Sequence, residues 1–148
     1  MKLSFSTNGW QLSFSELITR LADNKISGLE IHDLNSASFK FELPFERENI
    51  QRTKKLLFEY GISVSCIDAV GNLADKSKEE INKKEVLSII ETAKLLDCNF
   101  VRLHAFGSDA DETGSYLKDF MSELIESAED NGITLLMETM GIYADTER

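Results

Sequence analysis

Two patterns of apolar residues alternate along this chain. Short, continuous apolar runs, which are typical of buried strands, occur at residues 2–6, 29–32, 62–67, 100–104 and 133–137. Between these runs, apolar residues recur at intervals of three and four, which is the spacing of one helix face. The pattern predicts five strands that alternate with helices, and the clearest helical stripe consists of Leu117, Phe120, Met121, Leu124, Ile125 and Ala128.

Serine and glutamate mark the starts of two predicted helices. Ser13 precedes Glu16, and Ser77 precedes Glu80, at the spacing of a capping box, in which the serine side chain accepts a backbone N–H of the first turn. The apolar stripe after Ser13 is Phe14, Leu17, Ile18, Leu21 and Ala22. The stripe after Ser77 is Ile81, Val86, Ile89, Ile90, Ala93 and Leu96.

Glycine marks the ends of two other helices. A helix predicted from about residue 46 to Tyr60 is followed by Gly61, in the position of a left-handed cap. Asn131 and Gly132 end the last complete helix in the same way. Asp145 is a good N-cap for the first turn of one more helix.

Strand–helix–strand units of this kind predict a parallel α/β fold, either an open doubly wound sheet or a (β/α)8 barrel. No glycine-rich GxGxxG or GxxxxGK[ST] loop follows any predicted strand, which argues against the open nucleotide-binding sheet. A repeat of about 34 residues, taken eight times, gives the usual size of a barrel. We therefore expect one domain over residues 1–148, containing about the first four and a half βα units of a barrel truncated after strand five.

Such a half-barrel leaves open strand edges, so we expect a homo-oligomer unless the missing half is supplied.

Composition is that of an ordinary globular domain, with 42% hydrophobic and 28% charged residues among 148. No apolar run approaches the roughly 20 residues that cross a bilayer, and the N-terminus lacks a signal-peptide pattern. Cys66 and Cys98 have no CxxC spacing, which favours reduced thiols in the cytoplasm. The net charge of −10 argues against nucleic acid as a partner.

The candidate site residues lie at the carboxyl ends of the predicted strands, where a barrel has its active site. Asp68, His104 and Glu138 follow or end three of the strands, and His32 ends another. Alternation along a strand places Glu30 on the face of His32, and Arg102 on the face of His104. Carboxylates and imidazoles together suit a divalent cation such as Mn²⁺, Mg²⁺, Co²⁺ or Zn²⁺.

Each candidate also has a structural explanation. A carboxylate after an apolar run is costly unless it binds something, which favours a function for Glu138. His104 could be a hydrogen-bonded core histidine, and Asp68 could cap a turn. Glu30 and His32 could form a salt bridge in a loop. Trp10, just past the first strand, could wall a sugar pocket or pack on the first helix.

Several segments resemble one family. They are Gly-Leu-Glu-Ile at 28–31, Asn-Phe-Val-Arg-Leu-His at 99–104, Asn-Gly-Ile-Thr-Leu-Leu-Met-Glu-Thr at 131–139, and Ala-Asp-Thr at 144–146. Together they resemble the sugar phosphate isomerase/epimerase family with the xylose isomerase-like TIM barrel. The resemblance covers the whole chain but only the N-terminal half of the family's fold.

This resemblance implies a metal-dependent isomerase or epimerase that acts on a carbohydrate. It implies that Glu138 is a metal ligand and a catalytic base, that His104 is a second metal ligand, and that Glu30 and His32 contact substrate; Asp68 and Trp10 are further substrate-binding candidates. Related sequences often carry a histidine where this chain has Met140. The family's remaining metal ligands come from strands six to eight, so we expect little catalysis from this chain alone.

Three alternatives stay open at this point. The first is a nuclease of the same barrel superfamily, similar to endonuclease IV, although a net charge of −10 and two histidines count against it. The second is a non-catalytic half-barrel module that associates with itself. The third is a sugar-phosphate lyase or dehydratase, since it shares the first proton abstraction.

Overall fold

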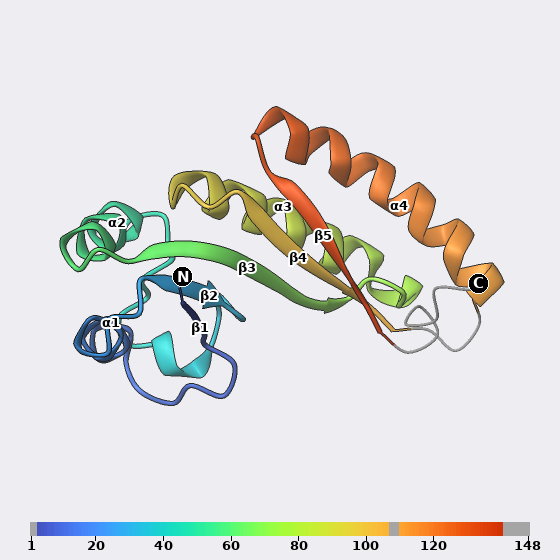
Figure 1. Cartoon of the computed structure of the whole chain (residues 1–148). Helices are drawn as coiled ribbons and strands as arrows, with labels where there is room; N and C mark the ends of the chain where they lie inside the picture. The colour runs from blue at the N-terminus through green and yellow to red at the C-terminus, as the bar shows by residue number, and fades with distance from the viewer. Residues whose placement is uncertain (1–2, 107–109, 141–148) are drawn as a thin grey trace.

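A five-stranded parallel sheet organises the molecule, and its strands lie side by side in the order of the sequence, β1-β2-β3-β4-β5. The computed structural model describes residues 3–106 and 110–140. The strands are β1 (Ser4–Ser6), β2 (Gly28–Ile31), β3 (Ser63–Asn72), β4 (Phe100–Ala105) and β5 (Thr134–Thr139) (Figure 1). The predicted number and order of strands are confirmed, and β3 is longer than the sequence pattern indicated.

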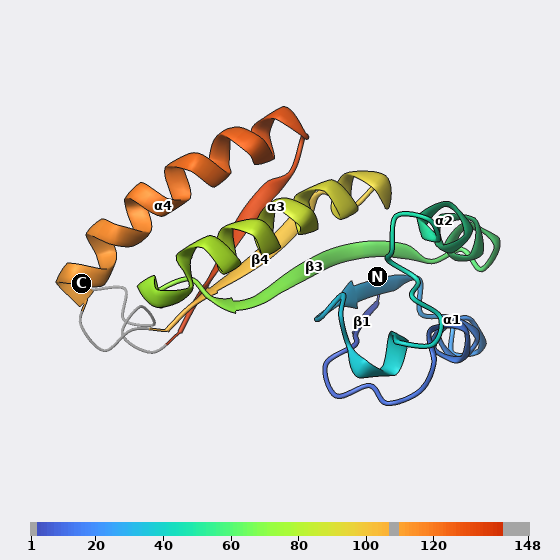
Figure 2. The same cartoon turned by 180° about the vertical axis from the view of Figure 1, so that it is seen from behind.

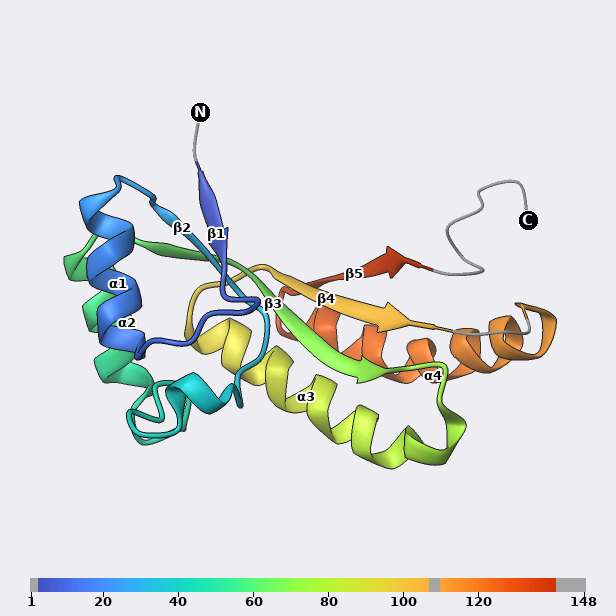
Figure 3. The same cartoon turned by 90° about the horizontal axis from the view of Figure 1, so that it is seen from below.

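The helices all lie on one side of the curved sheet (Figure 3). They are α1 (Phe14–Asp23), α2 (Ile50–Glu59), α3 (Glu79–Leu95) and α4 (Ala110–Asp130), with short 3-10 turns η1 (Ala37–Phe39) and η2 (Lys76–Lys78). Seen from behind, α3 and α4 cover β4 and β5 (Figure 2). The opposite face of the sheet has no helix over it within the described chain.

The core forms between the sheet and its helices. Alternate strand residues turn toward the helices and are fully buried, among them Leu29, Ile31, Ile67, Val101 and Leu103. Leu17, Ile18, Val86, Ile90 and Leu124 meet them from the helices. Because strand side chains alternate in direction, the same register sends the polar residues between them to the uncovered face.

Three helix ends follow the sequence prediction. The Ser13 hydroxyl accepts the backbone N–H of Glu16 at 3.3 Å and so caps α1. Gly61 and Gly132 lie two residues after the last residues of α2 and α4, with φ values of +66° and +69°. This is the left-handed conformation that glycine adopts without steric cost.

The second predicted capping box is wrong. The Asp75 carboxylate accepts the backbone N–H of Ser77 at 3.1 Å and its hydroxyl at 2.6 Å, and so caps η2. Helix α3 then begins at Glu79 without a side-chain cap. An aspartate reaches the N–H two residues ahead of itself, and this local turn takes the serine away from the helix.

Two predicted core positions and one boundary also differ. Ile81 is 65% exposed, because Asn82 takes the buried position and donates to the backbone carbonyl of Asn72. Ile125 is 44% exposed, since α4 covers the last strand of the described sheet. Helix α2 begins at Ile50 rather than near residue 46. The turn predicted at Asp145 lies outside the described residues.

Strand β3 contains two irregularities that set the register of the sheet. Between Leu29 and Glu30 the partner on β3 changes from Val64 to Cys66, and after Ala69 the next residue paired with β4 is Asn72. Extra residues in one strand bend it and increase its twist. Asp68 lies between the two irregularities, in a regular stretch where it pairs with Arg102 of β4.

The uncovered face and both sheet edges carry exposed apolar side chains. Leu3, Phe100, Leu136 and Met137 are between 39% and 53% exposed. Met137 is 39% exposed, and its strand β5 has a partner strand on one side only within the described residues. Of the helices in the described ranges, none has the length and apolar character to cross a bilayer.

Replacing Ser13 by alanine should lower the free energy of unfolding by about 1 kcal/mol, since it removes the acceptor for the first turn of α1. Urea unfolding followed by circular dichroism measures this. Ser77→Ala is the matched control and should cost less, because that serine does not cap a helix. Equal losses for both variants would contradict the assignment of the caps.

Candidate active site

Charged and polar side chains from four neighbouring strands meet on the uncovered face, toward the carboxyl ends of the strands. Glu30 comes from β2, and His32 follows that strand directly. Asp68 lies on β3, Arg102 and His104 on β4, and Glu138 on β5. We call these six residues the inner polar cluster. The structure therefore brings together five of the six predicted site residues.

Asp68 is the centre of the inner polar cluster. Its side chain has no exposed surface, and one oxygen, Oδ2, accepts from Nδ1 of His32 at 2.9 Å and from a terminal nitrogen (Nη2) of Arg102 at 2.6 Å. Nε2 of His104 lies 3.9 Å from the same oxygen. Because a carboxylate only accepts, Nδ1 of His32 is the donor in this contact, and the neutral tautomer with its proton on Nδ1 has Nε2 as an acceptor.

Arg102 contacts three carboxylates on three different strands. Besides Asp68, its Nη2 atom lies 3.2 Å from Oε1 of Glu30, and its Nε atom lies 3.2 Å from Oε2 of Glu138. The Nε–H bond is not aligned with Glu138, so this contact is an ion pair without a hydrogen bond. Burial disfavours the charged guanidinium, but the carboxylates outweigh burial and raise the pKa of Arg102.

His104 has polar atoms without hydrogen bonds. Its side chain is 9% exposed, and neither ring nitrogen makes a hydrogen bond within the described residues. Nδ1 lies 3.5 Å from Oε2 of Glu138, and the ring stacks parallel to Phe106 at a centroid distance of 6.1 Å. A buried imidazole without hydrogen bonds is costly unless a ligand satisfies it. His104 and Glu138 thus form a pair of metal-ligating groups suited to a divalent cation.

Two side chains that the sequence analysis did not single out bind backbone groups at the ends of β3 and β4. The Asn72 amide accepts the backbone N–H of Phe106 at 2.8 Å and donates to its carbonyl at 3.0 Å. The Glu85 carboxylate on α3 accepts the N–H groups of Val70 and Gly71, and burial raises its pKa. A single polar residue at a strand end resembles many loop residues, so no sequence signal distinguished Asn72.

The indole nitrogen of Trp10 makes no hydrogen bond to the inner polar cluster within the described residues. The Trp10 ring packs edge-on against Phe5 at a centroid distance of 5.6 Å, and its Nε1–H is buried with no hydrogen bond among the described residues. Its predicted role in substrate binding stays a prediction.

The described residues supply part of a metal site. No group of three or more histidine, cysteine or carboxylate side chains in this part of the chain is arranged to hold a metal ion. His104 and Glu138 are two adjacent donors, and Glu138 is 36% exposed toward the open side of the sheet. A tetrahedral or octahedral ion needs further ligands, and that these lie outside this chain stays a prediction.

A second hollow lies on the helix side of the sheet. A cleft of about 840 Å³ separates the segment between η1 and α2 from α3, and its walls include Phe39, Leu43, Arg47, Ile89 and Glu91. Asp68 also lines this cleft, but the other five residues of the inner polar cluster do not. We therefore place the candidate chemistry on the uncovered face.

A parallel sheet with sequential strand order, helices on one face and acidic and histidine side chains at the carboxyl ends defines a partial TIM barrel. The chain matches the family of the xylose isomerase-like TIM barrel over residues 18–146 and belongs to that family. No match was found among curated protein sequences.

Solved structures of related fold agree with this assignment. The IOLI protein with a bound zinc atom is similar with a TM-score of 0.75 at 17% identity, over 93% of this chain and 51% of that one. A D-tagatose 3-epimerase-like protein gives 0.75 at 21% identity, over 95% and 53%. D-psicose 3-epimerase with D-tagatose from Clostridium cellulolyticum gives 0.74 at 17% identity, over 99% and 55%. The chain thus spans about half the length of these structures.

Removing the Asp68 carboxylate should destabilise the fold strongly. In Asp68→Ala, Arg102 and His32 lose the acceptor they share, and breaking a buried pair in this way costs about 3–5 kcal/mol. Glu59→Ala is the control, because its ion pair with Lys55 is exposed and such pairs contribute little. Urea unfolding of both variants measures the difference. Similar, small losses would show that Asp68 does not hold the cluster together.

The Cys66 thiol should make stability fall with pH in alkaline solution. Burial, together with the charge of Asp68, raises its pKa from 9.0 to about 11. The unfolded chain therefore loses this proton first, and the free energy of unfolding falls as the pH rises from about 9 toward 11. In Cys66→Ala the fall over this range should be smaller. Urea midpoints at several pH values test this, and parallel curves would contradict it.

Proposed function

We propose that this chain forms the N-terminal half of a metal-dependent sugar or sugar-phosphate isomerase or epimerase. The observation that carries the proposal is the pair formed by His104 and Glu138, in a chain of the xylose isomerase-like family. The imidazole has no hydrogen bond among the described residues, and the carboxylate beside it is partly exposed. Both groups stand at the carboxyl ends of neighbouring strands, where a barrel binds its substrate.

The chain's own residues suit proton transfer beside a polarised oxygen. When bound, a divalent cation supplies a Lewis acid that polarises a carbonyl or hydroxyl oxygen of the sugar. Glu138 and His104 are the residues that would hold it. Glu138 then has a second task as the base that removes a proton from the adjacent carbon. Glu30 and the free Nε2 atom of His32 accept hydrogen bonds from sugar hydroxyl groups.

Similar structures support a carbohydrate substrate. One similar structure is described as D-tagatose 3-epimerase-like, and another contains D-tagatose. A third contains zinc, which supports a divalent metal in this fold. Because the chain spans about half of these proteins, the proposal includes further βα units that contribute the remaining ligands, and predicts little or no turnover by this chain alone.

The open sheet edges favour a second candidate function. Strands β1 and β5 each pair on one side only within the described residues, and apolar side chains are exposed beside them. A non-catalytic module that pairs through these edges, with itself or with a partner, would bury that surface. Such a module has no need of Glu138 or His104, so the metal experiment separates the two functions.

Glu138→Gln should weaken the binding of Zn²⁺ or Mn²⁺ to the chain at least tenfold, because the amide removes a charged ligand while keeping its shape. Isothermal titration calorimetry with each ion measures the dissociation constant. Glu59→Gln is the matched control, since Glu59 is an exposed residue of α2 paired with Lys55. It should bind the ions like the unaltered chain.

Two results would contradict the metal site. The unaltered chain could fail to bind either ion up to millimolar concentration, or Glu138→Gln could bind as tightly as Glu59→Gln. A stable oligomer that is unaffected by Glu138→Gln, found by sedimentation in the same samples, would then favour the non-catalytic module.

A further inference from the structure

Arg102 is connected both to the buried centre of the inner polar cluster and to its exposed side. At one end, Nη2 is fixed by Asp68 at 2.6 Å and by Glu30 at 3.2 Å. On its other side, Nε lies 3.2 Å from Oε2 of Glu138. The described ion pairs of Glu138 are with Arg102 and His104, and both involve Oε2.

We propose that Arg102 is the positioning residue of the site: anchored on Asp68, it holds Oε2 of Glu138 and leaves Oε1 for a cation or a substrate. The inference rests on the proposed function, since it assigns Glu138 a ligand to bind. If His104 turns to bind the same cation, Arg102 is the described side chain that still restrains Glu138. Groups that orient a ligating carboxylate commonly decide how well it binds the metal.

A role in positioning differs from simple charge neutralisation. The guanidinium is planar and presents Nε and Nη2 at fixed relative positions, so one side chain reaches β3 and β5 at once. A lysine ammonium carries the same charge on one nitrogen and cannot occupy both positions. Arg102→Lys therefore preserves the net charge of the cluster and removes the geometric connection.

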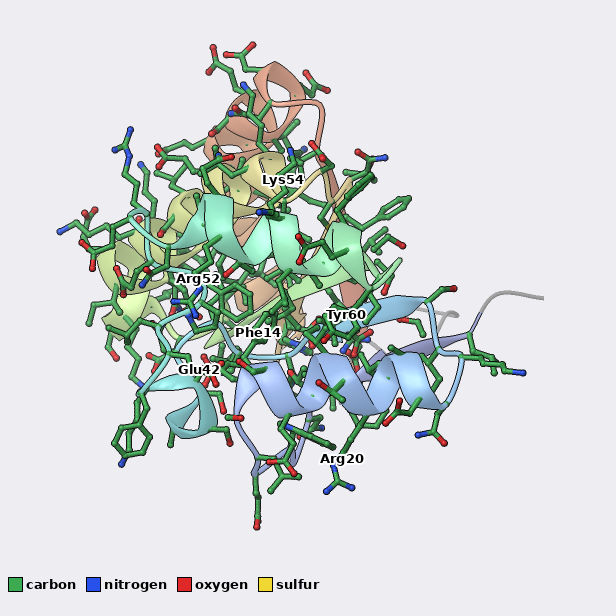
Figure 4. The ribbon with its side chains drawn as sticks, turned by 90° about the vertical axis from the view of Figure 1, so that its left-hand side faces the viewer. Phe14, Arg20, Glu42, Arg52, Lys54 and Tyr60 are labelled. Atoms are coloured by element: carbon green, nitrogen blue, oxygen red, sulfur yellow. The ribbon has the colours of Figure 1, made fainter. Side chains whose placement is uncertain are left out.

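The test compares Arg102→Lys with Arg20→Lys. Arg20 lies on the exposed surface of α1 (Figure 4), where it pairs with Glu16. Zn²⁺ affinity is measured by calorimetry, and the Co²⁺ absorption spectrum reports the geometry of the ligands. We expect Arg102→Lys to bind Zn²⁺ about 10–100-fold more weakly than the unaltered chain, with a changed Co²⁺ spectrum. Arg20→Lys should match the unaltered chain in both.

A second measurement uses the unaltered chain and Glu138→Gln, so it does not depend on whether Arg102→Lys folds. In the unaltered chain, the side-chain Nε–H resonance of Arg102 should shift when Zn²⁺ is added. It should also shift in Glu138→Gln, because Glu138 is the carboxylate nearest to Nε among the described ion pairs.

The outcomes separate the two proposals. If the unaltered chain binds neither Zn²⁺ nor Co²⁺, the proposed metal site is wrong, and the positioning role is wrong with it. If the chain binds both ions and Arg102→Lys has the same affinity and spectrum, the metal site stands and the positioning role is overturned. If Arg102→Lys does not fold, an Nε–H resonance that shifts neither with Zn²⁺ nor in Glu138→Gln overturns the positioning role.

Discussion

The burial of the Asp68 carboxylate constrains the whole candidate site. A charge without exposed surface is stable only where donors surround it, so Asp68 must have both Arg102 and His32 within reach. Arg102 lies on β4 and His32 directly follows β2, so the two donors come from either side of β3. Both contact Oδ2 of Asp68, and this one oxygen atom therefore links three neighbouring strands. Any shift by one residue would turn one partner toward the helices.

Strand β3 meets this constraint in the stretch between its two irregularities. Between the two changes of register, Asp68 pairs with Arg102 in a regular stretch of the ladder and lies within hydrogen-bond distance of His32. Alternation along β2, β4 and β5 then brings the other members of the cluster to the same face. Helices bury the apolar side chains of the strands on the opposite face. On the uncovered face, the polar side chains are held by one another, and no helix packs on them within the described chain.

Patterns that depend on local periodicity predicted most of this arrangement. The five strands, their parallel order and the shared face of Glu30 and Arg102 follow from alternation and from the βα repeat. Features for which two nearby residues compete for one structural role were not predicted. Asp75 took the capping role of Ser77, and Asn82 took the buried position expected for Ile81, because each makes a hydrogen bond that the apolar pattern does not reveal. The triple contact of Arg102 depends on distances between strands, which no single strand encodes.

The two sides of the inner polar cluster differ in how many of their charged and polar groups have partners. Toward β2 and β3, each charge has a partner: Glu30 and Asp68 share Arg102, and Asp68 holds His32. Toward β5, His104 lacks hydrogen bonds within the described chain, and Glu138 is partly exposed at the open edge of the sheet. The unused binding capacity thus faces the side on which a barrel of this family continues. In the proposed function, a ligand or further βα units on that side would complete the coordination of a cation, while Asp68 and Arg102 hold the side toward β2 and β3 in place.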